Sequence, residues 1–194
     1  MKRIILASGS PRRRELLAQT GSEFEVIPGE IDEAAAIRDI PKEEKYPETV
    51  VKVLSESKAR AVAEQISEGI IIGSDTIVWD GEIMGKPLDR ADAWRMLRRL
   101  QGRTHSVFTG VAVLIKDEAG MKKHVFASET KVEVYPMTES ETEAYLNTGE
   151  AMDKAGAYGI QGAFGLWVKR IEGDYNTVVG LPLSALWQVL KQYV

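Results

Sequence analysis

Apolar residues along the chain occur in segments with two different spacings. A continuous apolar run predicts a short buried strand over Ile4–Ser8, and the next segment predicts a helix from Pro11 to Gly21. Apolar residues recur at helical spacing over residues 48–66, which predicts the clearest helix of the chain. A second apolar run, Ile70–Trp79, predicts a strand buried on both faces. Strands and helices therefore alternate in this part of the chain.

The remaining segments continue this alternation. Further strands are predicted over residues 24–31, from Glu82, over 105–116, over 122–135 and near 164–171. Further helices are predicted from Asp89 to Gly102, from Thr138 to near Gly149 and from Pro182. The charged segment 34–47 contains two prolines and has no clean period, so it is predicted to be a surface loop. Because hairpin turns and crossover connections both occur, we expect an α/β protein with a mixed sheet.

Composition narrows the class of protein. A chain of 194 residues with 44% apolar and 28% charged residues is ordinary for a globular protein, and its length fits one domain over residues 1–194, with or without two lobes. The absence of cysteine excludes disulfides, zinc–thiolate sites and thiol nucleophiles. A net charge of −4 disfavours nucleic acid as a partner. No apolar stretch approaches the ~20 residues of a membrane span, so we expect a cytoplasmic protein without a membrane partner.

Three consecutive arginines, Arg12, Arg13 and Arg14, fall on the first turn of the first predicted helix. Cations are unfavourable there because the helix dipole is positive at its N-terminus. Either the arginines face water, or a strongly anionic ligand lies in the turn. Ser10 is the predicted N-cap, and the turn it forms with Gly9 would offer backbone N–H groups to a phosphate.

Asp75 interrupts the apolar run of the Ile70–Trp79 strand. A buried carboxylate is costly unless it is paired or binds a metal, whereas an aspartate at a strand edge simply reaches water. A two-residue hairpin turn at Asp80-Gly81 would place Asp75 opposite Lys86. Such a pair is either a structural ion pair or a catalytic one.

Lys58 lies within the apolar stripe of the predicted helix 48–66. Either its stem follows the helix edge to solvent, or its ammonium enters a cleft beside the sheet. The carboxylates Glu30, Asp32 and Glu33 follow the second predicted strand. They form either a solvated acidic loop or, together with the buried aspartate, an oxygen-rich magnesium site.

Residues 153–162, DKAGAYGIQG, form a glycine-rich segment that matches neither a P-loop nor a dinucleotide fingerprint. The segment is either a tight loop or a place where the backbone approaches a ligand closely. The amide of Gln161 presents a donor beside an acceptor, which matches the O4 and N3–H edge of uracil or thymine. Neither His105 nor His124 has a partner at metal-binding or catalytic spacing, so both are assigned to surface or structural positions.

Together these stretches resemble the Maf family of nucleoside triphosphate pyrophosphatases. The matching stretches, in chain order, are LASGSPRRRELL, GEIDE, SKAR, GSDTIV, GKP, GRTHSVFTGV, DKAGAYGIQG and GDYNTVVGLP. They run from residue 6 to residue 182, and AYGIQG looks like the subgroup that hydrolyses dTTP and UTP. The fold implied by the resemblance is an elongated mixed sheet flanked by helices, with two lobes around a central cleft, similar to inosine triphosphatase. Members are commonly homodimers.

The resemblance implies an enzyme that cleaves a pyrimidine nucleoside triphosphate to the monophosphate and pyrophosphate, with Mg²⁺ or Mn²⁺. The family's proton acceptor falls on Asp75, and its acidic metal-site position falls on Glu33. The phosphate-contacting positions fall on Ser10, Arg12, Arg13, Lys58 and Lys86, and the specificity positions fall on Arg12, Thr76 and Gln161. In this mechanism water attacks the α-phosphorus with Asp75 as the base. The metal lowers the pKa of the water and neutralises the phosphates, and the two lysines stabilise the leaving pyrophosphate.

A second hypothesis belongs to another class of protein. The family is associated with septum formation and growth arrest, so the chain would be a nucleotide-binding regulator of cell division that acts through protein partners. The same residues would then bind a triphosphate without rapid turnover.

Overall fold

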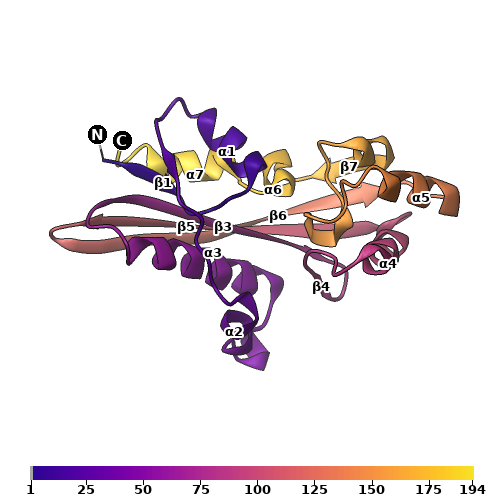
Figure 1. Cartoon of the computed structure of the whole chain (residues 1–194), viewed down its shortest axis with the longest axis horizontal. Coiled ribbons are helices and arrows are strands. Elements are labelled where there is room, and N and C mark those ends of the chain that lie inside the picture. Colours follow the sequence, from indigo (N-terminus) through magenta and orange to yellow (C-terminus); the bar gives the residue numbers. More distant parts are fainter. Residues whose placement is uncertain (1) are drawn as a thin grey trace. The chain divides into compact units, whose positions relative to one another are not determined.

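The computed structural model describes residues 2–194, and its helices and strands alternate along the chain (Figure 1). The strands are β1 (Ile4–Leu6), β2 (Glu25–Val26), β3 (Gly69–Trp79), β4 (Ile83–Met84), β5 (Thr104–Asp117), β6 (Gly120–Val134) and β7 (Val168–Glu172). The α-helices are α1 (Pro11–Ala18), α2 (Glu33–Arg38), α3 (Pro47–Ala63), α4 (Arg90–Leu100), α5 (Glu139–Asn147), α6 (Tyr175–Val179) and α7 (Leu183–Leu190). Short 3-10 helices are η1 (Lys42–Glu44), η2 (Ala155–Ala157) and η3 (Ala163–Trp167). Among the helices of residues 2–194, none combines the length and apolar character of a membrane span.

The described strands form one mixed sheet of seven strands. The order is β2-β1-β3-β5-β6-β7, and β4 pairs with β3. β1 is parallel to both of its neighbours, so that Ile5 lies opposite Glu25 on β2 and opposite Ile71 on β3. β4 is antiparallel to β3, and β7 is antiparallel to β6. The predicted α/β class with a mixed sheet is therefore confirmed.

The chain divides into two compact units. Unit 1 comprises Met1–Asp75, Thr109–Ser128 and Gly180–Val194, and unit 2 comprises Thr76–Phe108 and Glu129–Val179. β3, β5 and β6 each begin in one unit and end in the other. That the whole length, 1–194, acts as one domain stays a prediction.

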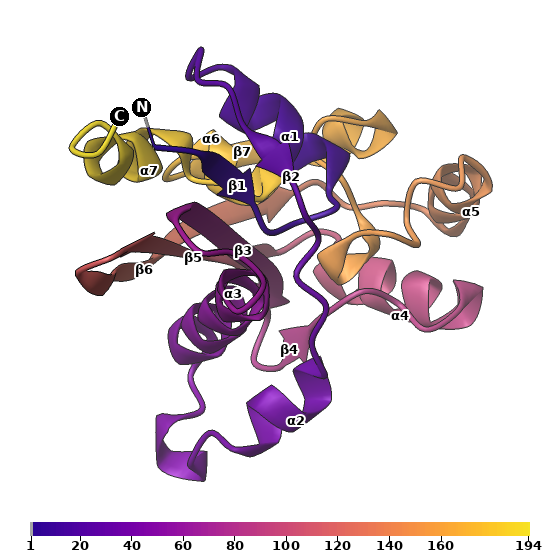
Figure 2. The ribbon, with the colours of Figure 1, turned by 60° about the vertical axis from the view of Figure 1, so that its left-hand side comes forward.

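In unit 1, α3 covers one face of the sheet, and α1 and α7 cover the other (Figures 1 and 2). α3 lies close to the strands because glycines stand where the helix crosses them. A Cβ at Gly73 would lie 2.1 Å from the carbonyl oxygen of Ser55, and a Cβ at Gly110 would lie 2.2 Å from that of Val51. Any larger residue at either glycine would push the helix away from the sheet.

The core of unit 2 is rich in aromatic side chains. The ring of Phe164 lies 4.4 Å from that of Tyr158 and 5.3 Å from that of Tyr145, between centroids. Both tyrosines and the phenylalanine are buried, and Trp167 and residues of α4 pack against them.

Two predicted helix starts in unit 2 are confirmed by their caps. The Asp89 carboxylate accepts a hydrogen bond from the Asp92 backbone at 2.7 Å at the start of α4. Thr138, the predicted start of α5, forms a capping box with Glu141.

The predicted loop over residues 34–47 is wrong, because this segment contains most of α2 and all of η1. The carboxylate of Asp32 caps α2 by accepting a hydrogen bond from the Ala35 backbone at 2.9 Å. Three consecutive alanines then favour the helix, and this local preference outweighs the charged composition that indicated a loop. The strand predicted over 24–31 is reduced to the two residues of β2.

The predicted hairpin register between β3 and β4 is wrong by one residue. Trp79 pairs with Ile83, so three residues rather than two form the turn. β4 ends at Met84, so the ladder stops before Lys86 and the predicted cross-strand pair of Asp75 with Lys86 does not form.

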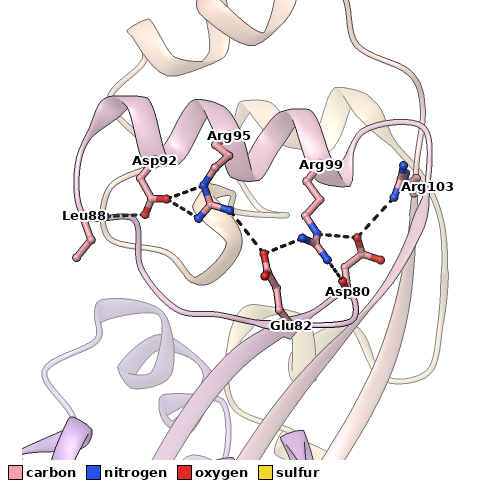
Figure 3. Close-up of polar contacts among 7 residues, drawn as sticks. All are labelled: Asp80, Glu82, Leu88, Asp92, Arg95, Arg99 and Arg103. Carbon is pink, nitrogen blue, oxygen red and sulfur yellow. Dashed lines mark hydrogen bonds and ion pairs between the residues drawn. The ribbon is translucent and has the colours of Figure 1, made fainter.

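An ion-pair network explains this longer turn (Figure 3). Arg99 of α4 donates to the carboxylate of Asp80 at 3.0 Å and to that of Glu82 at 2.7 Å. Arg95 lies 3.5 Å from the same Glu82 oxygen and 2.7 Å from Asp92. Exposed pairs contribute little one by one, but together they tie both ends of the turn to α4.

Near the C-terminus the helix predicted from Pro182 is confirmed as α7, with Pro182 at its N-cap. The strand predicted near 164–171 begins later, at Val168, because η3 occupies the preceding residues. The short helix α6 was not predicted.

Candidate active site

The buried carboxylate predicted at Asp75 lies on β3, at the end of the first segment of unit 1, and its side chain is 11% exposed. The ammonium nitrogen of Lys58 lies 2.6 Å from its Oδ1 and donates a hydrogen bond to it. The same nitrogen lies 2.7 Å from Oε1 of Glu33, whose side chain is half exposed. Of the two alternatives for Lys58, the structure places its ammonium inward, between two carboxylates.

Close backbone packing brings these three side chains together. Lys58 lies on α3, and the nearby approach of α3 to β3 at Gly73 directs it towards the strand that carries Asp75. The backbone before α2 also packs against α3, since a Cβ at Gly29 would lie 2.3 Å from the carbonyl oxygen of Lys58. Because only glycine fits there, the chain before α2 passes directly against α3 and brings Glu33 to the ammonium.

The charge state of Asp75 is set by opposing influences. Burial raises the pKa of the Asp75 carboxyl, and the nearby Glu33 acts in the same direction. The positive charges of Lys58 and Arg13 lower that pKa. The direction of the net shift is upward, so Asp75 binds a proton more readily than an exposed aspartate does.

Arg13 is held in unit 1 by groups that the sequence did not reveal. Its Nε donates to the carbonyl oxygen of Gly180 at 2.8 Å, and its Nη1 donates to Oγ of Ser8 at 3.1 Å. The buried hydroxyl of Ser74 donates to the same Gly180 oxygen at 3.0 Å. Burial lowers the pKa of the Arg13 guanidinium, and Arg12 adds to this effect, while Asp75 opposes it.

The turn before α1 differs from the prediction in one detail. Ser10 is the N-cap residue and Pro11 follows as predicted, but within residues 2–194 the Ser10 side chain makes no capping hydrogen bond to the helix. Its backbone N–H instead donates to Oγ of Ser8 at 3.3 Å. Arg12 is partly exposed and Arg14 is exposed.

The arrangement has the chemistry of a phosphate site. Three cations, Arg12, Arg13 and Lys58, accompany the two carboxylates of Glu33 and Asp75 in unit 1. Arginine forks bind phosphate oxygens well, and a helix N-terminus favours an anion. A buried carboxylate with a raised pKa is suited to accept a proton from water.

Glu33 and Asp75 also fit a divalent metal ion. Among residues 2–194, no group of three His, Cys, Asp or Glu side chains is placed to hold a metal. Glu33 and Asp75 nevertheless have oxygens around one cation, the Lys58 ammonium. Mg²⁺ commonly takes one or two carboxylates and completes its shell with water and phosphate oxygens, so this donor pair fits such an ion.

The other residues predicted for the site belong to unit 2. Thr76 follows Asp75 directly on β3 and is partly exposed. Lys86 is exposed just beyond β4, and Gln161 is exposed in the glycine-rich segment. The backbone of Gly85 accepts a hydrogen bond from Gly156 at 3.0 Å, which ties the lysine's segment to the glycine-rich one.

The histidines are structural, as predicted. Nε2 of His105 lies 2.8 Å from the Tyr158 hydroxyl, and Nε2 of His124 lies 2.7 Å from the Tyr193 hydroxyl. His105 is buried, so its position is the structural one of the two alternatives, surface or structural.

The fold and the site together define a class of protein, a mixed α/β protein with a site suited to phosphate chemistry. In this site arginines lie at the start of α1, and a lysine pairs with a buried carboxylate. The chain belongs to the Maf family, whose model, described as Maf-like protein, matches residues 3–193.

Two relatives are similar to the chain over nearly their whole length. A protein of Agathobacter rectalis named dTTP/UTP pyrophosphatase is 47% identical over 99% of this chain and 98% of its own. A protein of Bacillus anthracis with the same name is 46% identical over 100% of this chain and 96% of its own. A solved structure of a nucleoside-triphosphatase/dITP/XTP pyrophosphatase from Mycobacterium abscessus is 17% identical, with a TM-score of 0.36 over 68% of this chain and 72% of that chain.

Proposed function

We propose that this chain is a nucleoside triphosphate pyrophosphatase that hydrolyses dTTP and UTP to the nucleoside monophosphate and pyrophosphate. The observation that carries the proposal is the buried Asp75, 2.6 Å from the Lys58 ammonium. It occurs in a chain that is 46–47% identical, over nearly all its length, to relatives named dTTP/UTP pyrophosphatase.

Asp75 is the proposed general base. A water oxygen attacks the α-phosphorus, the water proton passes to the Asp75 carboxylate, and the bond from the α-phosphorus to the bridging oxygen breaks. Pyrophosphate leaves with that electron pair. The raised pKa of the Asp75 carboxyl supports this role, because a base whose pKa is closer to neutral accepts the proton more readily.

The cations are proposed to bind and stabilise the phosphates. Ser10, Arg12 and Arg13 lie at the start of α1, where backbone N–H groups and guanidinium forks favour phosphate oxygens. Lys58 and Lys86 are proposed to stabilise the negative charge that develops on the leaving pyrophosphate.

Glu33 and Asp75 are the proposed holders of Mg²⁺ or Mn²⁺. Such an ion, when bound, lowers the pKa of water and neutralises phosphate charge. The Lys58 ammonium lies between these two carboxylates, 2.7 Å from Glu33 and 2.6 Å from Asp75. We therefore expect Lys58 to move from the carboxylates towards the phosphates when metal and substrate bind.

Gln161 and Thr76 are the proposed specificity residues, together with Arg12. The Gln161 amide would accept a hydrogen bond from N3–H and donate one to O4 of uracil or thymine. Cytosine presents the opposite pattern at these two positions, so CTP would be a poorer substrate when the Gln161 amide is held in this orientation. A cytoplasmic location, a homodimer and the absence of a nucleic-acid partner stay predictions.

The test is pyrophosphate release from UTP, dTTP, CTP, GTP and 7-methyl-GTP, with Mg²⁺ or Mn²⁺ and with a chelator. We expect metal-dependent release mainly from UTP and dTTP, with the monophosphate as co-product. Asp75→Asn should reduce the rate by ~10² to 10⁴. Asp117→Asn is the matched control. It removes an exposed carboxylate of the same unit, which forms an ion pair with the exposed Lys2.

Two results would contradict the proposal. Release of single phosphates would mean attack at the terminal phosphorus. Tight binding of a triphosphate that is recovered intact would instead support the nucleotide-binding regulator of cell division.

A further inference from the structure

The turn that carries Gln161 is closed by a backbone hydrogen bond. The N–H of Gly162 donates to the carbonyl oxygen of Gly159 at 3.2 Å, so Gln161 is the third residue of a four-residue turn. Gln161 itself is exposed. Its direction is therefore set by how firmly the turn is held, rather than by packing of its own side chain.

Two side chains fasten this turn at its two ends, Tyr145 from α5 and Glu150 from the segment that follows this helix. The hydroxyl of Tyr145 accepts a hydrogen bond from the backbone of Gly159 at 3.3 Å. The carboxylate of Glu150 accepts from the backbone of Ala163, at 3.1 Å to Oε2 and 3.3 Å to Oε1. Of the two backbone donors, Gly159 precedes Gln161 and Ala163 follows it.

Glu150 is packed unusually closely against the turn. A Cβ at Gly162 would lie 2.0 Å from Oε2 of Glu150, so the carboxylate occupies the space that a side chain would need there. The carbonyl oxygen of Glu150 also accepts a hydrogen bond from Nζ of Lys154 at 2.6 Å. The Lys154 stem in turn lies where a Cβ of Gly159 would be, 2.6 Å from Cε. Glu150 thus contacts the Gly162 end of the turn directly and reaches the Gly159 end through the stem of Lys154.

We propose that Glu150 is a positioning residue for base selection, which fixes the Gly159–Gly162 turn so that the Gln161 amide faces the pyrimidine edge. This inference rests on the proposed function. A carboxylate that accepts from a backbone N–H makes a charge-assisted hydrogen bond, and these are stronger than neutral ones. Without it, Gln161 would sample several directions, and discrimination between O4 and an amino group would fall while phosphate binding would remain.

The experiment compares Glu150→Ala with Glu150→Gln, which keeps an acceptor oxygen in the same place. For each variant, kcat/KM is measured with UTP and with CTP. We expect Glu150→Ala to lower the UTP-to-CTP ratio roughly tenfold, and Glu150→Gln to retain most of it. Glu143→Ala is the control, because it removes an exposed carboxylate of α5 that pairs with Arg90, and it should leave the ratio unchanged.

A double-mutant cycle and amide exchange separate positioning from general stability. If Glu150 acts through Gln161, adding Glu150→Ala to Gln161→Ala should lower the ratio no further. Hydrogen exchange at Ala163 should be faster in Glu150→Ala than in the wild type. Should Glu150→Ala fail to fold, Glu150→Asp, with the carboxylate drawn back by one methylene, should show an intermediate ratio and faster exchange.

An equal fall of kcat/KM for UTP and CTP in a folded variant would overturn the inference, as would unchanged exchange at Ala163. An active wild type with an unchanged ratio in Glu150→Ala would overturn this inference alone. A wild type that hydrolyses neither UTP nor dTTP would overturn the proposed function and, with it, this inference.

Discussion

His105 makes the stability of this protein sensitive to mild acid. Its side chain is buried at 3% exposure, and burial lowers its pKa from 6.5 to about 4, although Asp80 acts in the opposite direction. Nε2 is paired with the Tyr158 hydroxyl, while Nδ1 is buried without a hydrogen-bond partner among residues 2–194. A second proton on this ring would therefore introduce a charge that nothing nearby stabilises well.

The sign and size of the effect follow from proton linkage. Below pH 6.5 the unfolded chain binds a proton at His105, whereas the folded protein does so only near pH 4, so acid favours unfolding across this window. For a folded pKa of about 4, the loss at pH 5 relative to pH 7.5 is about 2 kcal/mol. In a chain of this length, that corresponds to a fall in Tm of roughly 4–8 °C.

The assay is urea unfolding between pH 5 and pH 7.5, on the wild type and on His105→Gln. Glutamine does not titrate but keeps a polar group near Tyr158, so the two proteins share every other titrating group. We expect the free energy of unfolding to fall by about 2 kcal/mol more in the wild type than in the variant over this range.

Equal pH dependence in the wild type and His105→Gln would refute this reasoning. It would mean that His105 is protonated as readily in the folded protein as in the unfolded chain. Tyr158, the hydrogen-bond partner of His105, lies in the glycine-rich segment that also carries Gln161. We therefore expect the preference for UTP over CTP to fall over the same pH range in which acid destabilises the protein.

Three further predictions concern the packing and charges of the two units. Gly73→Ala should lower Tm by several degrees, because its Cβ would lie 2.1 Å from the carbonyl oxygen of Ser55. Gly85→Ala is the control and should leave Tm unchanged, because its Cβ would meet no atom within 4 Å. Thermal unfolding measures both variants. Lys58→Met should lower kcat/KM for UTP by roughly a hundredfold or more, because it removes a cation proposed to stabilise the leaving pyrophosphate and leaves the buried Asp75 carboxylate without its ammonium partner. Steady-state kinetics on a folded variant checks this prediction, and near-normal turnover would contradict it. Thr138→Ala should destabilise by about 1 kcal/mol through loss of the capping box, measured by urea unfolding, and no change would mean that water replaces the cap.

Several residues of the candidate site stand out in the sequence because their types are out of place in their own segments. Asp75 stands in an apolar strand, Lys58 in the apolar stripe of a helix and the arginines at the wrong end of a helix dipole. Each anomaly is local and is visible without the fold. What each residue contacts is not local, and the predicted partner of Asp75 was wrong for this reason. The register depended on a turn that ion pairs with α4 lengthen by one residue.

The supports of the site had no sequence signal of their own. Ser8 and Gly180 hold Arg13, and Glu150 and Tyr145 hold the Gln161 turn, but a serine, a glycine and a glutamate in polar surroundings are unremarkable. Apart from the contact of Ser8 with Arg13, which are five positions apart, these contacts join residues 13 to 167 positions apart along the chain, so hydropathy patterns do not record them.

The sequence by itself determined the order and type of most elements, the caps of α4 and α5, and the residue types available for phosphate chemistry. These depend on spacing and propensity within a few residues. The tertiary structure decided which charges meet. Glycines at positions 29, 73 and 110 let α3 approach its neighbours closely, and that approach brings the Lys58 ammonium between Glu33 and Asp75. Helix-to-strand distance is a property of packing, and only the folded chain specifies it.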